Sequence, residues 1–157
     1  MVEITKSTIK SSIWRNFYDR IKSEITTISI SISPGSQTIQ TYASSFSDVD
    51  FSSKDNFPII LINTPKVPQE QFTFKKTQVN ATIDIEVYCT NSQAADKFSD
   101  AINEAIETYK GDFADLGIHM LELDSTDDDF SENGNIKVHM RRSRFKMNYK
   151  FSRTGAY

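Results

Sequence analysis

The sequence predicts a small α+β domain with a mixed, mostly antiparallel sheet and two helices packed on one face. Two segments, near residues 6–24 and 91–110, have the period of amphipathic helices. Several other segments alternate apolar and polar residues, as half-buried strands do. Short turns between neighbouring strands favour antiparallel pairing. The chain of 157 residues fits a single domain over 1–157.

The first helix is expected from about Lys6 to Glu24, because large apolar residues recur every fourth position. This apolar stripe consists of Ile9, Ile13, Phe17, Ile21 and Ile25. The period changes to two at residues 28–33, which predicts a strand that Pro34-Gly35 ends. The Ser-rich stretch 33–56 that follows is expected to form turn, weak strand and surface loop.

Two strands are expected in the middle of the chain. The continuous apolar run 57–62 is typical of a strand buried on both faces. Residues 79–89 alternate regularly and predict the clearest strand, whose apolar row ends at Cys89. We interpret Cys89 as a small core residue rather than a reactive thiol. The core is predicted to join this strand to both helices through Ile13, Phe17, Ile21, Ile83, Ile85, Phe98 and Ile102.

The second helix is expected to begin at the N-caps Asn91-Ser92 and to stop at Gly111. A strand is expected over 116–123. Residues 124–135 are expected to be an acidic, flexible connection, ending in the turn signal Asn-Gly-Asn.

The last strand is expected over about 136–151. Its apolar pattern shifts phase between Met140 and Phe145. A β-bulge near residues 141–144 would reconcile the two halves, so one is predicted there.

Composition argues for an ordinary globular protein. Hydrophobic residues make up 38% and charged residues 25% of the chain, and the net charge of −3 argues against a basic duplex-binding protein. The single cysteine excludes an intramolecular disulfide, and no apolar run approaches the roughly 20 residues that cross a membrane. The first residues also lack a signal-peptide core. We therefore expect a protein made in the cytoplasm.

No catalytic, cofactor-binding or metal site is expected. His119 and His139 lack neighbours at metal-ligand spacing, and the chain has neither a phosphate-binding glycine loop nor a nucleophile elbow. The acidic run Asp127-Asp128-Asp129 does not fit a calcium-binding EF-hand loop, since Glu132 stands where glycine is needed. A pair of carboxylates on the strand 79–89 resembles a glycosidase pair only superficially.

Opposite charges are separated over a short distance near the C-terminus. The acidic connection is followed by an element without acidic residues that carries Lys137, Arg141, Arg142, Arg144, Lys146, Lys150 and Arg153. This strand is either an ordinary exposed face, a subunit contact between opposite patches, or a phosphate-backbone contact. Its alternating aromatics resemble a nucleic-acid stacking face, although their phase suits a core face better.

The connection from Lys66 to Lys76 is longer than a tight hairpin and carries two aromatics, Phe72 and Phe74. The sequence leaves two interpretations open. Either these side chains fold back onto the core, or they form an arm that packs on another subunit.

The order of these patterns resembles the tail terminator, or tail-completion, proteins of long-tailed viruses. The resemblance covers roughly residues 57–151: the apolar strand, the strand Ile83-Asp84-Ile85-Glu86-Val87-Tyr88, the helix with Ala95-Asp96 near its start, and the C-terminal strand. It rests on element order and pattern, without an invariant motif. The Ser-rich stretch has no counterpart in it.

The resemblance implies a sheet flanked by helices and a structural, non-enzymatic role in the virion. Such proteins form rings, commonly hexameric, that cap the head-proximal end of the tail tube and end its polymerisation. Their partners are the tail tube protein and the head connector or neck proteins, and genome DNA passes through the lumen without specific binding. No cofactor and no membrane are implied. The alternatives are another neck or head-completion protein, and a nucleic-acid-binding module that uses the basic strand.

A ring would require a heterologous subunit contact, in which each copy offers different patches to its two neighbours. We expect an aromatic anchor to supply affinity and opposite charges to set register. The predicted contact residues are Phe72, Phe74, Asp127, Asp128, Asp129, Lys137, Arg141, Arg142 and Arg144.

Overall fold

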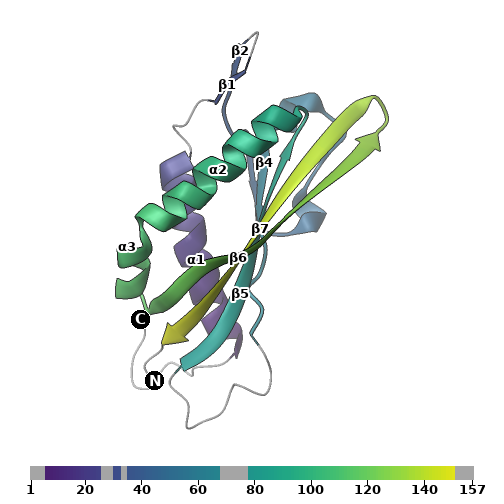
Figure 1. Ribbon diagram of the computed structural model, residues 1–157. Coiled ribbons are helices and arrows are strands. Elements are labelled where there is room, and N and C mark those ends of the chain that lie inside the picture. The colour runs from purple at the N-terminus through teal and green to yellow at the C-terminus, as the bar shows by residue number, and fades with distance from the viewer. Residues whose placement is uncertain (1–5, 26–29, 33–34, 68–77, 151–157) are drawn as a thin grey trace.

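The protein is an α+β domain in which helices cover one face of a mixed five-stranded sheet (Figure 1). The computed structural model describes residues 6–25, 30–32, 35–67 and 78–150, and every structural statement below concerns these residues. The described helices are α1 (Lys6–Ile25), α2 (Ser92–Thr108) and α3 (Lys110–Asp115), with 3-10 turns η1 (Phe46–Asp48) and η2 (Lys54–Asn56). The strands are β1 (Ile30–Ile32), β2 (Gly35–Gln37), β3 (Thr41–Ala43), β4 (Ile59–Ile62), β5 (Gln78–Cys89), β6 (Ile118–Asn133) and β7 (Ile136–Lys150).

The main sheet has the strand order β3-β4-β5-β7-β6, with β1 and β2 forming a separate two-stranded ribbon. Among the described strands of this sheet, the β3–β4 pair alone is parallel, and the other pairs are antiparallel. The long strands β5 and β7 pair without interruption from Gln78↔Lys150 to Cys89↔His139. This confirms the predicted fold class.

One face of the sheet, here called the helix face, holds the main core. Alternate residues of β5 point to it, from Val79 to Cys89, and pack against the apolar stripes of α1 and α2. The predicted core set is confirmed, since Ile13, Phe17, Ile21, Ile83, Ile85, Phe98 and Ile102 all belong to this cluster. Burial of each such side chain stabilises the fold by about 1.5–3 kcal/mol.

A smaller core lies on the opposite face, near the turn that joins β6 and β7. There the segment between β3 and β4 folds over the sheet, and its Phe51 ring stacks on Phe57 and contacts Tyr88. The buried members of this second cluster are Ala43, Phe57, Ile59, Leu61, Tyr88, Ile136, Val138 and Met140. The Ser-rich stretch thus contributes a lid over one end of this face, as short strands and 3-10 turns.

The predicted bulge in the last strand is wrong. β7 is regular against β5 through residues 141–144, and the register shifts lie instead in β6, between His119/Glu122 and Leu123/Ser125. The apolar phase changes because each half of β7 is covered on a different face. Met140 faces the second cluster, and Phe145 faces the helices.

Two boundaries in the second half of the chain are also wrong. Residues 124–133 belong to β6, which pairs with β7 as far as Asn133↔Ile136, so they are not a flexible connection. The turn signal itself is confirmed, with Gly134 at φ +63. Gly111 does not stop a helix, because α2 ends at Thr108 and Gly111 lies inside α3.

Candidate interaction surface

The face opposite the helices carries a row of charged and polar side chains between β5 and β7. On β5 these are the alternate residues Asn80, Thr82, Asp84 and Glu86, and on β7 they are Asn148, Lys146, Arg144 and Arg142. Asp84 lies opposite Arg144 and Glu86 lies opposite Arg142, so each acid meets a guanidinium group across the strands. Opposite charges at such positions stabilise a sheet.

The Asp84–Arg144 pair is bidentate. Arg144 donates from Nε to Asp84 Oδ1 at 2.8 Å and from Nη2 to Oδ2 at 3.0 Å. The hydrogen bonds from Arg144 hold the pKa of the Asp84 carboxyl below its ordinary value, against the opposing effect of burial. The same pairing raises the pKa of Arg144. Both groups therefore stay charged throughout the neutral range.

The next pair along the sheet is more deeply buried. Arg142 Nε donates to Glu86 Oε1 at 2.7 Å, and the Tyr88 hydroxyl donates to Glu86 Oε2 at 2.7 Å. The Glu86 side chain is only 7% exposed. Burial first, and then the bond to Glu86, raises the pKa of Tyr88, so the phenol remains a donor. Glu86 thus has a partner for each oxygen, as a buried carboxylate requires.

The third arginine of this strand points to the other side of the sheet. Arg141 Nε donates to Asp96 Oδ1 of α2 at 2.6 Å. All three guanidinium groups of the basic strand are therefore engaged by carboxylates of β5 and α2. These arginines were expected to meet acids of another subunit. Their partners Asp84, Glu86 and Asp96 could not be predicted, because strand register cannot be read from composition.

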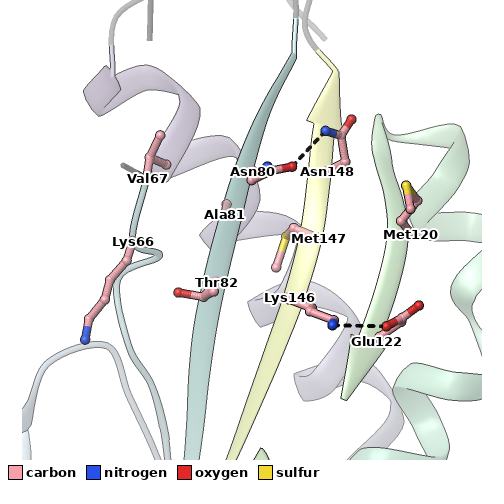
Figure 2. Close-up of a pocket in the computed structure, with 10 residues that line it drawn as sticks. All are labelled: Lys66, Val67, Asn80, Ala81, Thr82, Met120, Glu122, Lys146, Met147 and Asn148. Carbon is pink, nitrogen blue, oxygen red and sulfur yellow. Dashed lines mark hydrogen bonds and ion pairs between the residues drawn. The ribbon is translucent and has the colours of Figure 1, made fainter. Parts of the chain in front are cut away.

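A groove of about 570 Å³ crosses the open end of the polar row. Figure 2 shows its floor on β5 and β7, with Lys66 and Val67 along one side and Met120 and Glu122 of β6 along the other. The floor is tied by an amide bond from Asn148 Nδ2 to Asn80 Oδ1 at 3.0 Å.

Met120 projects at the rim of this groove and is 77% exposed. Its backbone has φ +54, which is uncommon for a residue other than glycine. It lies between paired residues His119 and Glu122, where β6 shifts register. Bulges in edge strands re-aim side chains, and here the result is an exposed thioether beside a groove.

A second, more polar cleft of about 440 Å³ adjoins the groove and shares Lys66 and Thr82 with it. Its other lining residues include both ion pairs and the exposed ring of Phe46. The face opposite the helices is therefore hollowed along much of its length.

Strand β6 forms one edge of the sheet. Its residues from Glu122 to Asn133 are exposed, apart from half-buried Ser125. Two of the exposed side chains are large and apolar, Leu123 at 47% and Phe130 at 49%. The Phe130 ring contacts His139 on β7, with ring centroids 4.9 Å apart. Figure 1 shows β6 and β7 as a long ribbon that ends in a free turn.

The structure distributes the predicted contact residues over several environments. Phe72 and Phe74 lie outside the described residues. Asp127, Asp128 and Asp129 are exposed on β6, where they lie opposite Arg142, Arg141 and Met140 of the same chain. Lys137 is exposed beside Glu132 near the turn.

Of the residues considered for chemistry, Cys89 and His139 are cross-strand partners on β5 and β7, whereas His119 lies on β6. Cys89 is fully buried in the main core, as predicted, and burial raises the pKa of its thiol to about 12. His119 lies near the start of β6, opposite Asn148, and His139 of β7 lies opposite Phe130 near the other end of β6. Within the described ranges, no group of three or more His, Cys, Asp or Glu side chains is placed to hold a metal ion. No described helix is long and apolar enough to span a bilayer.

Comparison with known proteins gives no assignment: neither a protein-family model nor a curated protein sequence matches this chain.

Proposed function

We propose that this protein is a structural subunit that assembles with copies of itself into a ring, and that the ring caps the head-proximal end of a viral tail tube. The observation that best supports a role in assembly is the β6–β7 ribbon, which presents an open strand edge and exposed apolar side chains among the described residues. Surfaces of this kind are normally covered by another protein. The specific role at the tail tube is proposed because the order of the elements resembles that of tail terminator proteins.

The subunit contact has to be revised from the one expected from sequence. Arg141, Arg142 and Arg144 are held by carboxylates of their own chain, so reaching a neighbour would first leave Asp96, Glu86 and Asp84 unpaired. A buried carboxylate without its partner is strongly unfavourable, which applies to Glu86 and Asp84. Asp96 is 61% exposed, so for Arg141 the cost is the loss of its 2.6 Å hydrogen bond. We therefore retain Phe72, Phe74 and Lys137 as contact residues and leave the arginines out.

The nucleic-acid alternative loses support from the same pairing. Phosphate binding depends on cations that release counterions when they meet the backbone. The arginines of β7 are already neutralised, and the neighbouring strand β6 adds acidic residues beside them. We do not propose a DNA-binding function.

The test of the proposed role is tube capping. The tail tube protein encoded in the same genome is polymerised with and without this protein, and tube lengths are measured by electron microscopy. A cap should shorten the tubes and appear at one end only. Tubes of unchanged length with no bound protein would contradict the capping role, and binding without shortening would favour a different neck protein.

A further inference from the structure

Among the described residues, the outer edge of β6 is an unpaired row of backbone groups. Within the described residues β6 pairs with β7 alone, and no backbone hydrogen bond joins its other side to a loop. Open edges of this length are templates for an added strand. The strand has 16 residues, compared with three in β3 at the opposite edge of the sheet.

The direction of the free donors follows from one contact. The backbone N–H of Phe130 donates to the side chain of Asp129, at 2.8 Å from Oδ1, so it is not directed at β7. In an antiparallel pair, residues alternate between facing the partner and facing away from it. The N–H groups of Asp128 and Glu132 therefore also point outward.

This edge is strongly acidic. Five carboxylates, called the acidic edge, lie along this strand: Asp124, Asp127, Asp128, Asp129 and Glu132. Lys146 lies 3.9 Å from Asp124, whereas the other four carboxylates make no salt bridge with a described residue. The arginines of adjacent β7 are hydrogen-bonded to carboxylates of β5 and α2 and form no salt bridge with the acidic edge, although Arg144 interacts electrostatically with Asp124 and Asp127. The edge therefore keeps an excess of negative charge.

A second copy of β6 is an unfavourable occupant. An antiparallel self-pairing centred on Asp128 would place Asp127 opposite Asp129 and Asp124 opposite Glu132. Like charges directly opposite one another destabilise a strand pair. Charge complementarity points instead to a cationic strand, and the described part of this chain offers no basic strand with a free edge, since β7 is paired on both sides.

We propose that β6 accepts an extended segment of a different protein, rich in lysine or arginine, as an added strand of the sheet. This assignment rests on the proposed role as an assembly protein and names the chemistry of one partner. Backbone hydrogen bonds to the outward groups supply affinity, and the acidic edge selects the partner by charge.

Asp129 adds selectivity to this edge. Its carboxylate occupies the N–H of Phe130, so a neutral strand must displace it without compensation. A lysine or arginine on the incoming strand attracts the carboxylate and frees the donor. The exposed rings and chains of Phe130 and Leu123 then lie beside apolar residues that alternate with the cations of that strand.

The test uses a short fluorescent peptide that alternates lysine with valine, titrated into the full-length protein. One control peptide carries glutamate in place of lysine. Two more carry N-methyl groups, one on the odd-numbered residues and one on the even-numbered residues. N-methylation keeps the charge but removes backbone donors. The lysine peptide should bind, and the glutamate peptide should not. The N-methylated peptide whose missing donors would face β6 should bind at least about tenfold more weakly than the lysine peptide.

A pair of variants makes the same distinction in the protein. Asp128→Pro removes an outward N–H and a charge, whereas Asp128→Ala removes the charge alone. Proline at an outward position is compatible with an edge strand. Binding of the lysine peptide should be about tenfold weaker in Asp128→Pro than in Asp128→Ala. If Asp128→Pro fails to fold, the N-methyl peptides still decide the question with the wild-type protein.

Three results would overturn the proposal: no binding of the lysine peptide, equal binding of the glutamate peptide, or equal binding of every N-methylated peptide. The last result would mean simple charge attraction. The mass of the protein measured in the same solution separates this proposal from the ring. If the protein is a monomer and binds the peptide, the ring is contradicted and the added strand is not. If the protein forms a ring and does not bind the peptide, the added strand is contradicted and the ring is not.

Discussion

Arg144 donates two hydrogen bonds to the carboxylate of Asp84, directly across the β5–β7 pair, at 2.8 and 3.0 Å. This contact joins residues 60 positions apart in the sequence. The sequence of β7 is basic, but this contact and the Arg142–Glu86 pair neutralise two of its arginines within the same sheet. The net charge exposed at this end of the sheet therefore comes from β6.

The Asp84–Arg144 pair should make stability depend on pH. Because the pKa of Asp84 is lowered in the folded protein, its contribution is fully present above the ordinary value of 3.8 and is lost as the pH falls further. Urea midpoints measured between about pH 6 and pH 2 should fall less steeply in Asp84→Asn than in wild type. Equal slopes would contradict the pairing.

Arg144→Gln provides the matched control for that measurement. It leaves the carboxyl in place but removes the donor that lowers its pKa, so it should flatten the same part of the profile. A double-mutant cycle between the two positions should give a coupling energy of about 1 kcal/mol, since the pair is partly exposed.

Ile85→Ala should destabilise the protein by about 2–5 kcal/mol. The Ile85 side chain is 1% exposed and belongs to the main core between the sheet and the helices. Leu123→Ala is the control, because Leu123 is 47% exposed, and its effect should stay within about 0.5 kcal/mol. Free energies of unfolding from urea titrations compare the two. Equal losses would mean that the core is placed wrongly.

Two glycines should respond oppositely to alanine. Gly117 has φ +90, and a Cβ there would lie 2.5 Å from the backbone oxygen of Lys150, so Gly117→Ala should cost at least about 1–3 kcal/mol. Gly111 lies in α3 with no atom within 4 Å of an added Cβ, so Gly111→Ala should stabilise by roughly 0.5–1 kcal/mol. Thermal unfolding of both variants checks the signs. Destabilisation by both would contradict the placement of α3.

The elements that could be predicted from sequence are those whose apolar residues follow one pattern along the whole length. They include β4, whose continuous apolar run predicted a strand buried on both faces. α1 and β5 each show an apolar row to a single core, so their periods of four and two were informative. β7 crosses from one core to another, from Met140 facing the aromatic cluster to Phe145 facing the helices. A strand covered on opposite faces in its two halves produces the same phase shift as a bulge, and the pattern alone does not separate them.

The strand conformation of the acidic part of β6 could not be predicted for a related reason. Its residues are exposed on both faces, so they show no alternation, and their strand conformation depends on hydrogen bonding to β7. Helix α3 was missed because Gly111 resembles a C-terminal stop. The exposed edge of β6 therefore could not be predicted from the sequence, although its acidic residues are plain in the sequence. Only the structure shows that acidic charge and free backbone groups lie on one edge.

Removing the side chain of Asp129 should make the edge less selective. Asp129→Ala frees the N–H of Phe130 and lowers the negative charge, so the variant should self-associate more than wild type as concentration rises. Asp55→Ala removes one exposed carboxylate elsewhere, in η2, and serves as the charge-matched control. Sedimentation velocity over a concentration series distinguishes them. Equal self-association of the two variants would show that Asp129 does not limit pairing at the edge of β6.

The proposed closed assembly of identical subunits is tested most directly by the mass of the purified protein in solution. Native mass spectrometry over a range of concentrations, alone and with tail tubes, should give one discrete multiple of the 17.9 kDa chain, with six copies expected from the family resemblance. Mass that grows continuously with concentration would indicate open filaments. A monomer at every concentration, with tubes present as well as absent, would contradict the ring.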